Sequence, residues 1–228
     1  MTTQGMMALM PPAGAATWTA SDLPGTRVLT ALRAANLAFL DLLDGAAPVA
    51  AGGSGGLPLF SLEPLAAEPA ARRALVEALP FALFDLRFRD DPFWRAAAAG
   101  AAAVHDATAG RRVEPVVLSF ARIAVMFSWH TVEVCAPSAC LVLGASEGVL
   151  RLLGDLPLAS LEPLSSRVAP VLGARFAQRA IFWERVAQCL RDPHPRQLER
   201  LRLLGLQLQG SESARRLQLQ RRAGLRDP

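Results

Sequence analysis

The chain has 228 residues, and 52% of them are hydrophobic, which is enough for a packed core and excludes a disordered or collagen-like protein. All 24 basic side chains are arginine, so a Schiff-base lysine and a phosphate-loop lysine are both excluded. Three cysteines are too few for a disulfide scaffold.

The net charge is concentrated at the C-terminal end. Residues 1–190 hold 15 arginines and 16 acidic residues, whereas residues 191–228 hold 9 arginines and 4 acidic residues. A basic tail of this kind is typical of contact with nucleic acid, an anionic membrane or an acidic protein. The alternative interpretation is a solvated helix end and frayed terminus.

Residues 1–25 are interpreted as a flexible leader. They contain no arginine, and Pro11 and Pro12 interrupt the apolar run, so they match no secretory signal. From Thr26 the apolar residues recur with a helical period as far as Asp44-Gly45, which predicts the first helix.

A glycine-rich linker at 50–56 precedes a helix that Ser61 is expected to cap and that runs to Leu79. Pro80 to Phe88 alternates with period two and predicts a short strand or an extended crossing segment. Asp90 or Asp91 is expected to cap a further helix that continues through the alanine run 96–103.

The most apolar stretch, Val116 to Leu143, is long enough to raise the question of a membrane span. It contains Arg122, His130 and Glu133, and an ionised group at a bilayer centre costs about 2.5–3.5 kcal/mol. A buried core helix, from Pro115 to about Val134, is therefore expected. The protein is expected to be cytoplasmic and to have no membrane contact.

Further short helices are predicted in the second half. Ser146 is expected to cap one that Gly154 ends, and another starts near Ser160. A later helix is expected to include Phe176, Phe182 and Trp183 and to stop before the prolines at 193 and 195. The last helix carries a leucine seam and is expected to break at Gly210-Ser211.

An internal repeat links the two halves. Residues 57–65 and 156–164 are identical at eight of nine positions, Leu-Pro-Leu-Phe/Ala-Ser-Leu-Glu-Pro-Leu. Arg87-Phe88 then recurs as Arg175-Phe176, and Phe93-Trp94 recurs as Phe182-Trp183. This order favours a duplication into two helical units that bury each other's apolar faces as a pseudo-dimer, with Trp94 and Trp183 in related environments.

No group of residues predicts an enzyme. His130, Cys135 and Cys140 have no second Cys/His pair nearby to complete a zinc site, so the two cysteines are expected to be core residues without metal. Arg87 and Arg175 recur among aromatic residues and are expected to stack on rings or pair with acids. His194 is expected to face solvent.

The segment Ser146 to Arg167 has the size of a helix-turn-helix. Its second helix offers only Ser160, Ser165, Ser166 and Arg167 as polar side chains. Base readout usually uses arginine, asparagine or glutamine at several such positions, so a packing corner is favoured over a DNA-reading motif.

The second half, Ala121 to Phe176, resembles the FlhD-type subunit of the bacterial flagellar master transcriptional regulator. The likeness lies in a long first helix, then Leu143-Gly144 with Ser146-Glu147, a leucine-rich short helix and Arg175-Phe176 at the end. Asn36 to Phe39 and Phe84 to Phe88 echo the same start and end in the first half. The resemblance implies a helical, cytoplasmic, oligomer-forming regulator subunit that acts with a zinc-binding partner. This chain differs in being duplicated and in having few polar readers.

The sequence therefore predicts an all-α protein of two related units, 26–105 and 113–192, followed by a basic helix and tail at 195–228. We expect a non-enzymatic, FlhD-like regulatory protein that binds a protein partner, with duplex DNA and a second copy of the chain as further candidate partners. The alternative is a helical adaptor or chaperone-like subunit of a bacterial motility or secretion system. No cofactor or metal is expected. Contact residues are predicted at Arg167, Arg215, Arg216, Arg221 and Arg222.

Overall fold

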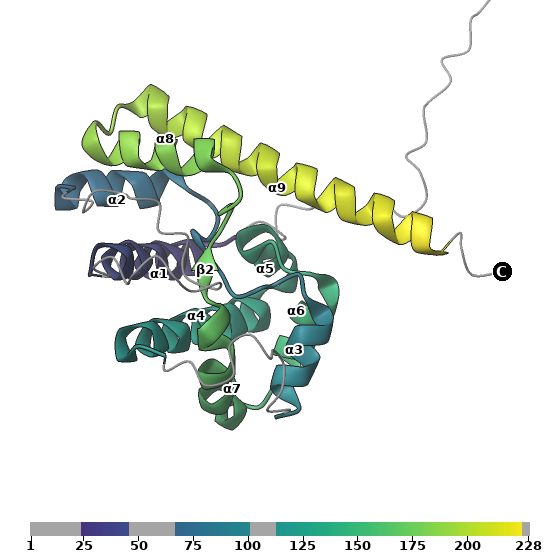
Figure 1. Ribbon diagram of the computed structural model, residues 1–228. Coiled ribbons are helices and arrows are strands. Elements are labelled where there is room, and N and C mark those ends of the chain that lie inside the picture. Colours follow the sequence, from purple (N-terminus) through teal and green to yellow (C-terminus); the bar gives the residue numbers. More distant parts are fainter. Residues whose placement is uncertain (1–23, 46–66, 101–112, 225–228) are drawn as a thin grey trace, which may run out of the picture.

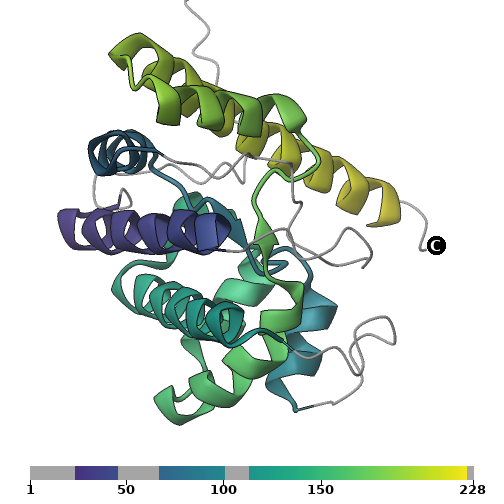
Figure 2. The same ribbon diagram turned by 60° about the vertical axis from the view of Figure 1, so that its left-hand side comes forward.

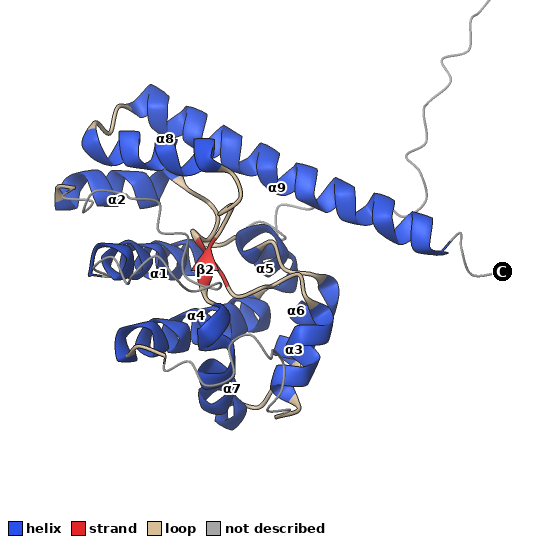
Figure 3. Cartoon of the chain, viewed as in Figure 1, coloured by secondary structure: helices blue, strands red, loops and turns tan. Residues whose placement is uncertain are grey.

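The computed structural model describes residues 24–45, 67–100 and 113–224 (Figure 1). This part of the chain folds into nine α-helices and one pair of two-residue antiparallel strands, which confirms the predicted all-α class (Figure 3). The elements are α1 (Thr26–Gly45), α2 (Pro69–Ala78), β1 (Phe84–Asp85), α3 (Asp91–Ala98), α4 (Pro115–Val134), α5 (Ala136–Leu143), α6 (Glu147–Gly154), α7 (Leu161–Val168), β2 (Gly173–Ala174), α8 (Ala180–Arg191) and α9 (Pro195–Gly224).

Five helices form a stack in the order α8, α2, α1, α4, α7, from top to bottom in Figure 1, and each contacts the next. Helices α3, α5 and α6 close the side of the stack, and α9 lies along α8 and α2. The stack interleaves the halves, because α8 from the second half lies beside α2 from the first. One hydrophobic cluster therefore contains residues from both halves.

The aromatic centre of the core joins the two halves directly. The ring of Phe120 lies 5.3 Å from that of Phe39 and 5.2 Å from that of Phe84. Trp183 packs edge-on against Phe39 at 6.5 Å. Aromatic pairs at such separations add to the stability that area burial alone provides.

Several predicted helix boundaries are confirmed, and each has a local cause. Helices α1 and α4 begin and end where the periodicity predicts. The Asp90 carboxylate accepts the Phe93 N–H at 3.0 Å at the start of α3, and the Ser146 hydroxyl accepts the Val149 N–H at 3.1 Å at the start of α6. Such caps satisfy backbone donors that the first helical turn leaves without partners.

Other boundaries are corrected. Helix α2 begins at Pro69 behind Glu68, so the helix ending near Leu79 does not extend back to Ser61, which lies outside the described residues. Helix α3 ends at Ala98, before the left-handed Gly100. Phe176 belongs to a turn before α8, because its φ of 56° is incompatible with a right-handed helix.

The expected period-two pattern of Pro80 to Phe88 is only partly right. A strand forms, but it is limited to Phe84 and Asp85, which pair with Ala174 and Gly173. Residues on both expected faces, such as Leu83 and Phe84, are fully buried. Residues 81–83 are all buried, because the core encloses that part of the segment, and alternation is seen only from Phe84 to Phe88, where Asp85 and Arg87 are partly exposed.

The two halves correspond at a constant spacing. Thr26 and Pro115 start α1 and α4, which both have 20 residues, and these starts are 89 positions apart. The same spacing separates the starts of β1 and β2 and those of α3 and α8. Each strand pairs with its own counterpart, which is the pattern of a local twofold axis. The interpretation of the halves as a duplicated pseudo-dimer stays a prediction.

This spacing corrects the register of the repeat by one residue. Arg87 corresponds to Phe176: both have a positive φ, 57° and 56°, and both carbonyls accept the N–H three residues later at 2.8 Å. Trp94 and Trp183 each donate the indole N–H to a carbonyl eight residues earlier, at 3.1 and 2.8 Å. The first copy of the nine-residue repeat, at 57–65, lies outside the described residues.

Candidate partner and nucleic-acid interface

Helix α9 is the most prominent feature of the surface, since it runs along α8 and then extends past the body of the molecule (Figures 1 and 2). Its leucine seam faces the core, as predicted for docking on the body: Leu201 is 1% exposed, and Leu198, Leu204 and Leu208 pack against the core from the edge. The expected break at Gly210-Ser211 is wrong, because the helix continues to Gly224. A glycine inside a helix costs about 1 kcal/mol relative to alanine, which the flanking helix formers and the docked turns outweigh.

Helix α9 approaches the body closely at Gly205. A Cβ atom at this position would collide with the Phe81 ring, and Phe81 is fully buried against Phe176 and Phe182. Only a residue without a side chain lets the helix backbone rest on this ring. Gly205 therefore sets the distance of α9 from the core.

One turn further along, α9 is held by polar contacts to the end of α5. The Gln209 amide donates to the Leu141 carbonyl, and Glu212 forms an ion pair with Arg89. Arg89 also donates its Nε–H to the Gly144 carbonyl at 3.0 Å. We call Arg89, Gln209 and Glu212 the α9 latch, because together they tie the helix to the carbonyl end of α5.

Arg175 also belongs to this polar cluster at the end of α5. Its guanidinium donates to the Val142 carbonyl at 3.0 Å and stacks on the Phe176 ring at 5.2 Å. It also leaves no room for a side chain at Gly144, whose backbone is left-handed. A cation at the C-terminal end of a helix is stabilised by the helix dipole. Burial lowers the pKa of Arg175 to about 10, against the opposing effect of Asp85. The side chain is therefore still charged at neutral pH.

Beyond the latch, α9 is a basic arm, which we define as residues 213–224. Arg215 is exposed, and the helical backbone places Arg222 two turns after it. Arg216 and Arg221 lie on the same helix. Four of the five predicted contact residues thus lie on one continuous helix that projects from the body. The sequence predicts a loose tail after a break at Gly210 instead.

Arg167, the fifth predicted contact residue, lies elsewhere. It is in α7, away from the arm (Figure 1), and its guanidinium donates to the Ala97 carbonyl at 3.0 Å. Ala97 is in the last turn of α3 and its carbonyl also accepts the Gly100 N–H at 3.3 Å, so Arg167 adds a second donor at this helix end. Its predicted contact with DNA or a partner stays a prediction, but the structure assigns it a structural partner.

The corner between α6 and α7 is packed into the core and does not project from the surface. Leu161, Leu164 and Val168 of α7 are buried, and the hydroxyl of Ser165 is buried on the Leu161 carbonyl at 2.7 Å. The exposed Glu162 is paired with Arg122 of α4 at 2.5 Å, which puts an acidic residue on the face that would meet DNA. These contacts favour the packing corner that the sequence indicates.

The cysteines differ from expectation in burial. Cys135, between α4 and α5, and Cys140, at the edge of the core, are half-buried, whereas Cys189 of α8 is fully buried. Burial raises the pKa of the Cys140 and Cys189 thiols, so both are neutral at pH 7. Among the described residues no three His, Cys, Asp or Glu side chains are grouped to hold a metal ion. The absence of zinc from the protein stays a prediction.

His194 is exposed, as expected, whereas His105 lies outside the described residues. Arg87 stacks on the Phe93 ring at 5.2 Å and pairs with Asp90 at 2.9 Å, which confirms the predicted environment of the recurring arginines.

The residues of the latch were not identified from the sequence. Arg89 and Glu212 are more than 120 positions apart, and neither belongs to a motif. The only local signal was helical spacing: Glu212 lies four residues after Leu208 and Gln209 lies eight residues after Leu201, which puts both near the side of the helix that carries the leucine seam.

Comparison with protein-family models, with curated proteins and with solved structures finds no match to this chain.

Among the described helices, α4 is long and apolar enough to cross a membrane, with a mean hydropathy of 1.3 over its most apolar window. In this fold it is packed between α1, α5, α6 and α7 and contributes buried residues such as Phe120 and Val125 to the core.

Proposed function

We propose that the protein is a non-enzymatic regulatory subunit, FlhD-like in type, whose basic arm binds a protein partner and duplex DNA. The observation that carries the proposal is the arm itself: four arginines on one helix that is anchored by the latch and projects from the body (Figure 2). Arginine suits phosphate and carboxylate ligands, because its guanidinium donates several hydrogen bonds in a fixed planar geometry.

Anchoring matters for this role. A frayed tail loses conformational entropy when it binds, whereas a helix that is already formed and fixed at one end loses less. The polar and apolar contacts at Leu201, Gly205, Gln209 and Glu212 hold the arm in a set direction relative to the core. One face of α4, with Phe120, Ala124 and Val125, is buried in the core, which supports the proposed cytoplasmic protein that acts without a membrane.

The test is a salt series of binding to a fluorescent DNA duplex, measured by anisotropy. The variant carries glutamine at Arg215, Arg216, Arg221 and Arg222, and the matched control carries glutamine at four exposed arginines elsewhere, Arg27, Arg73, Arg95 and Arg191. For four phosphate contacts we expect the slope of log K against log salt to fall by about 3–4 in the arm variant. The control should keep the original slope.

Equal slopes for the two variants contradict a DNA contact by the arm. A pull-down from the native host with the wild type and the arm variant then tests the protein partner separately. A partner that is retained by the wild type and the control and lost by the arm variant supports that contact.

A second candidate function, a helical adaptor, is favoured by one observation. Leu203 and Leu206 are 50% and 39% exposed on the side of α9 that faces away from the core. They offer an apolar strip to a partner helix. Glutamine at these two positions should abolish partner capture in an adaptor and leave DNA binding unchanged.

A further inference from the structure

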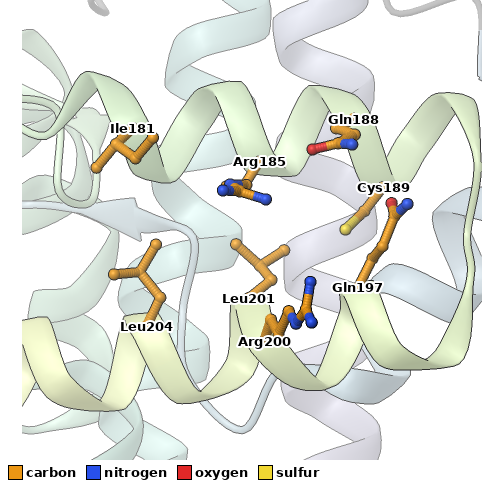
Figure 4. Close-up of a pocket in the computed structure, with 8 residues that line it drawn as sticks. All are labelled: Ile181, Arg185, Gln188, Cys189, Gln197, Arg200, Leu201 and Leu204. Atoms are coloured by element: carbon orange, nitrogen blue, oxygen red, sulfur yellow. The ribbon is translucent and has the colours of Figure 1, made fainter.

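A pocket of about 420 Å³ lies between α8 and the first half of α9 (Figure 4). This volume falls within the range of small-molecule sites. The two helices are antiparallel neighbours joined by a tight turn at residues 192–194, so both walls of the pocket are regular and well supported.

The lining changes character from one end to the other. Ile181 and Leu204 face each other at one end, and Gln197 and Cys189 lie at the other (Figure 4). Arg185 projects from α8 and Arg200 from α9 into the space between (Figure 4). None of the described residues that line the pocket is acidic.

Two kinds of polar group in the pocket lack a partner within the described part of the chain: the two arginines and one glutamine oxygen. Neither Arg185 nor Arg200 is in an ion pair with any residue that the structure describes. The Oε1 atom of Gln197 is buried and accepts no hydrogen bond within the described part of the chain. A buried polar atom without a partner is rare in folded proteins and calls for an explanation such as a ligand.

The other end is apolar and open. Ile181 is 50% exposed, although a residue of this size gains by losing contact with water. The thiol of Cys189 is neutral and adds weakly polar surface to the pocket wall. Ile181 and Gln188 are separated by roughly 10 Å along the axis of α8, which is long enough for a short alkyl chain.

We propose that this pocket binds a small amphiphilic anion, with its acidic head between Arg185 and Arg200 and its alkyl chain along Ile181, Leu201 and Leu204. Two guanidinium groups on facing helices suit a carboxylate or phosphate head. A hydroxyl elsewhere on the ligand, or the P–OH group of a singly ionised phosphate head, donates to Gln197 Oε1. The inference does not depend on the contacts proposed for the basic arm, since none of its residues belongs to the arm.

The experiment is calorimetric titration of the full-length chain with sodium octanoate at low salt. We expect one saturable site per chain. Acetate, which has the head without the chain, and octanol, which has the chain without the charge, should each bind at least tenfold more weakly. Octyl phosphate, run in parallel, distinguishes a preference for a phosphate head from one for a carboxylate head.

Variants locate the site. Arg185→Gln and Arg200→Gln should each weaken octanoate binding about tenfold, and Ile181→Ser should weaken octanoate but not acetate. The matched controls are Arg191→Gln on α8 and Arg202→Gln on α9, exposed arginines that do not line the pocket. They should bind octanoate within twofold of the wild type. All five replaced side chains are exposed, and the near-ultraviolet circular dichroism of each variant checks that the fold is intact.

Three results overturn the proposal. The first is the absence of saturable binding by either octyl ligand at millimolar concentration. The second is equal loss of affinity in the pocket variants and the control variants, which indicates general attraction to a basic surface. The third is equal affinity for octanoate and acetate, which removes the role of the apolar end.

Discussion

Gly205 and Gly210 lie on the same helix but meet different surroundings. A Cβ at Gly205 would strike the buried Phe81 ring, whereas a Cβ at Gly210 would meet nothing within 4 Å. We expect Gly205→Ala to lower the free energy of unfolding by about 1–3 kcal/mol through overpacking. Gly210→Ala should raise it by up to about 1 kcal/mol through helix propensity. Urea denaturation followed by circular dichroism measures both, and equal effects of the two substitutions would contradict the close approach.

Asn36 is a fully buried polar residue in α1. Its amide donates to the Phe81 carbonyl at 3.0 Å, and its oxygen accepts the Leu83 N–H at 2.9 Å. These bonds fix the extended segment that leads into β1. Asn36→Leu leaves two buried backbone groups unsatisfied, so we expect it to cost about 2–5 kcal/mol.

Thr30→Ala is the control for Asn36, since it removes an exposed hydroxyl that bonds back to Thr26 of the same helix at 2.9 Å. We expect a change within about 0.5 kcal/mol. Chemical denaturation of both variants gives the comparison. An Asn36→Leu protein as stable as Thr30→Ala would show that the buried amide is not a determinant of the fold.

The thiols of Cys140 and Cys189 give the stability a pH dependence of known sign. Burial raises both pKa values above the unfolded value of 9.0, so the folded state holds its protons more tightly than the unfolded state. Stability is then fully present below pH 9 and is lost as the pH rises above it. We expect the free energy of unfolding to fall between pH 8 and pH 10.

Replacing Cys140 and Cys189 together by alanine should flatten that fall, and Thr30→Ala, which removes no titratable group, should leave it as it is. Urea denaturation at a series of pH values, with reducing agent present, provides the measurement. The lowered pKa of Arg175 acts in the opposite direction, but only above about pH 10, where its folded and unfolded charges begin to differ.

At the scale of elements, α9 divides at the latch into a docked part and an arm. Glu212 pairs with Arg89, with both side chains about a third exposed, whereas the arm beyond contains the exposed Arg215. We expect deletion of residues 215–228 to leave the free energy of unfolding within about 0.5 kcal/mol of the full chain. Deletion of residues 211–228 also removes the ion pair and should cost up to about 1 kcal/mol more.

Thermal and urea denaturation of the two truncated chains tests this division. Amide hydrogen exchange adds a local readout: protection around Leu208 and Gln209 should decrease in the longer deletion and not in the shorter one. Unfolding of the protein by the shorter deletion would show that the arm is part of the structural core and cannot serve as a free contact surface.

In the molecule as a whole, the two halves share one hydrophobic core. Phe84 of the first half packs against Phe120 and Phe127 of the second, with ring centroids 5.2 and 6.3 Å apart, and the strands pair only with each other. A half of about 100 residues that loses these partners exposes much of its core. We expect residues 24–112 and 113–228, expressed separately, to lack cooperative unfolding, and an equimolar mixture to regain it.

Near-ultraviolet circular dichroism, which reports the packing of Trp94 and Trp183, follows the reconstitution. An isolated second half that unfolds cooperatively with native-like tryptophan signals would contradict the shared core. It would instead favour two domains that fold separately.

Local patterns predicted the helices well. The periodicity from Thr26 and from Pro115, the Asp90 and Ser146 caps and the stop after Arg191 all depend on neighbouring residues, and each is confirmed. The basic charge of the final segment was also evident from the sequence, and so was its leucine seam. The predicted break at Gly210 failed, because α9 passes through this exposed glycine and the helix formers on both sides outweigh its cost.

The all-α class, most helix limits and the concentration of positive charge in the last helix could be predicted from the sequence alone, because these follow from propensity, capping and composition along short stretches of chain. The remaining features depend on the three-dimensional packing. The register that pairs Arg87 with Phe176, the burial of Cys189, the latch from Arg89 to Glu212 and the facing arginines of the α8–α9 pocket all join residues that are separated along the chain. Such contacts depend on how helices pack, and side-chain packing in three dimensions leaves no short-range pattern in a single sequence.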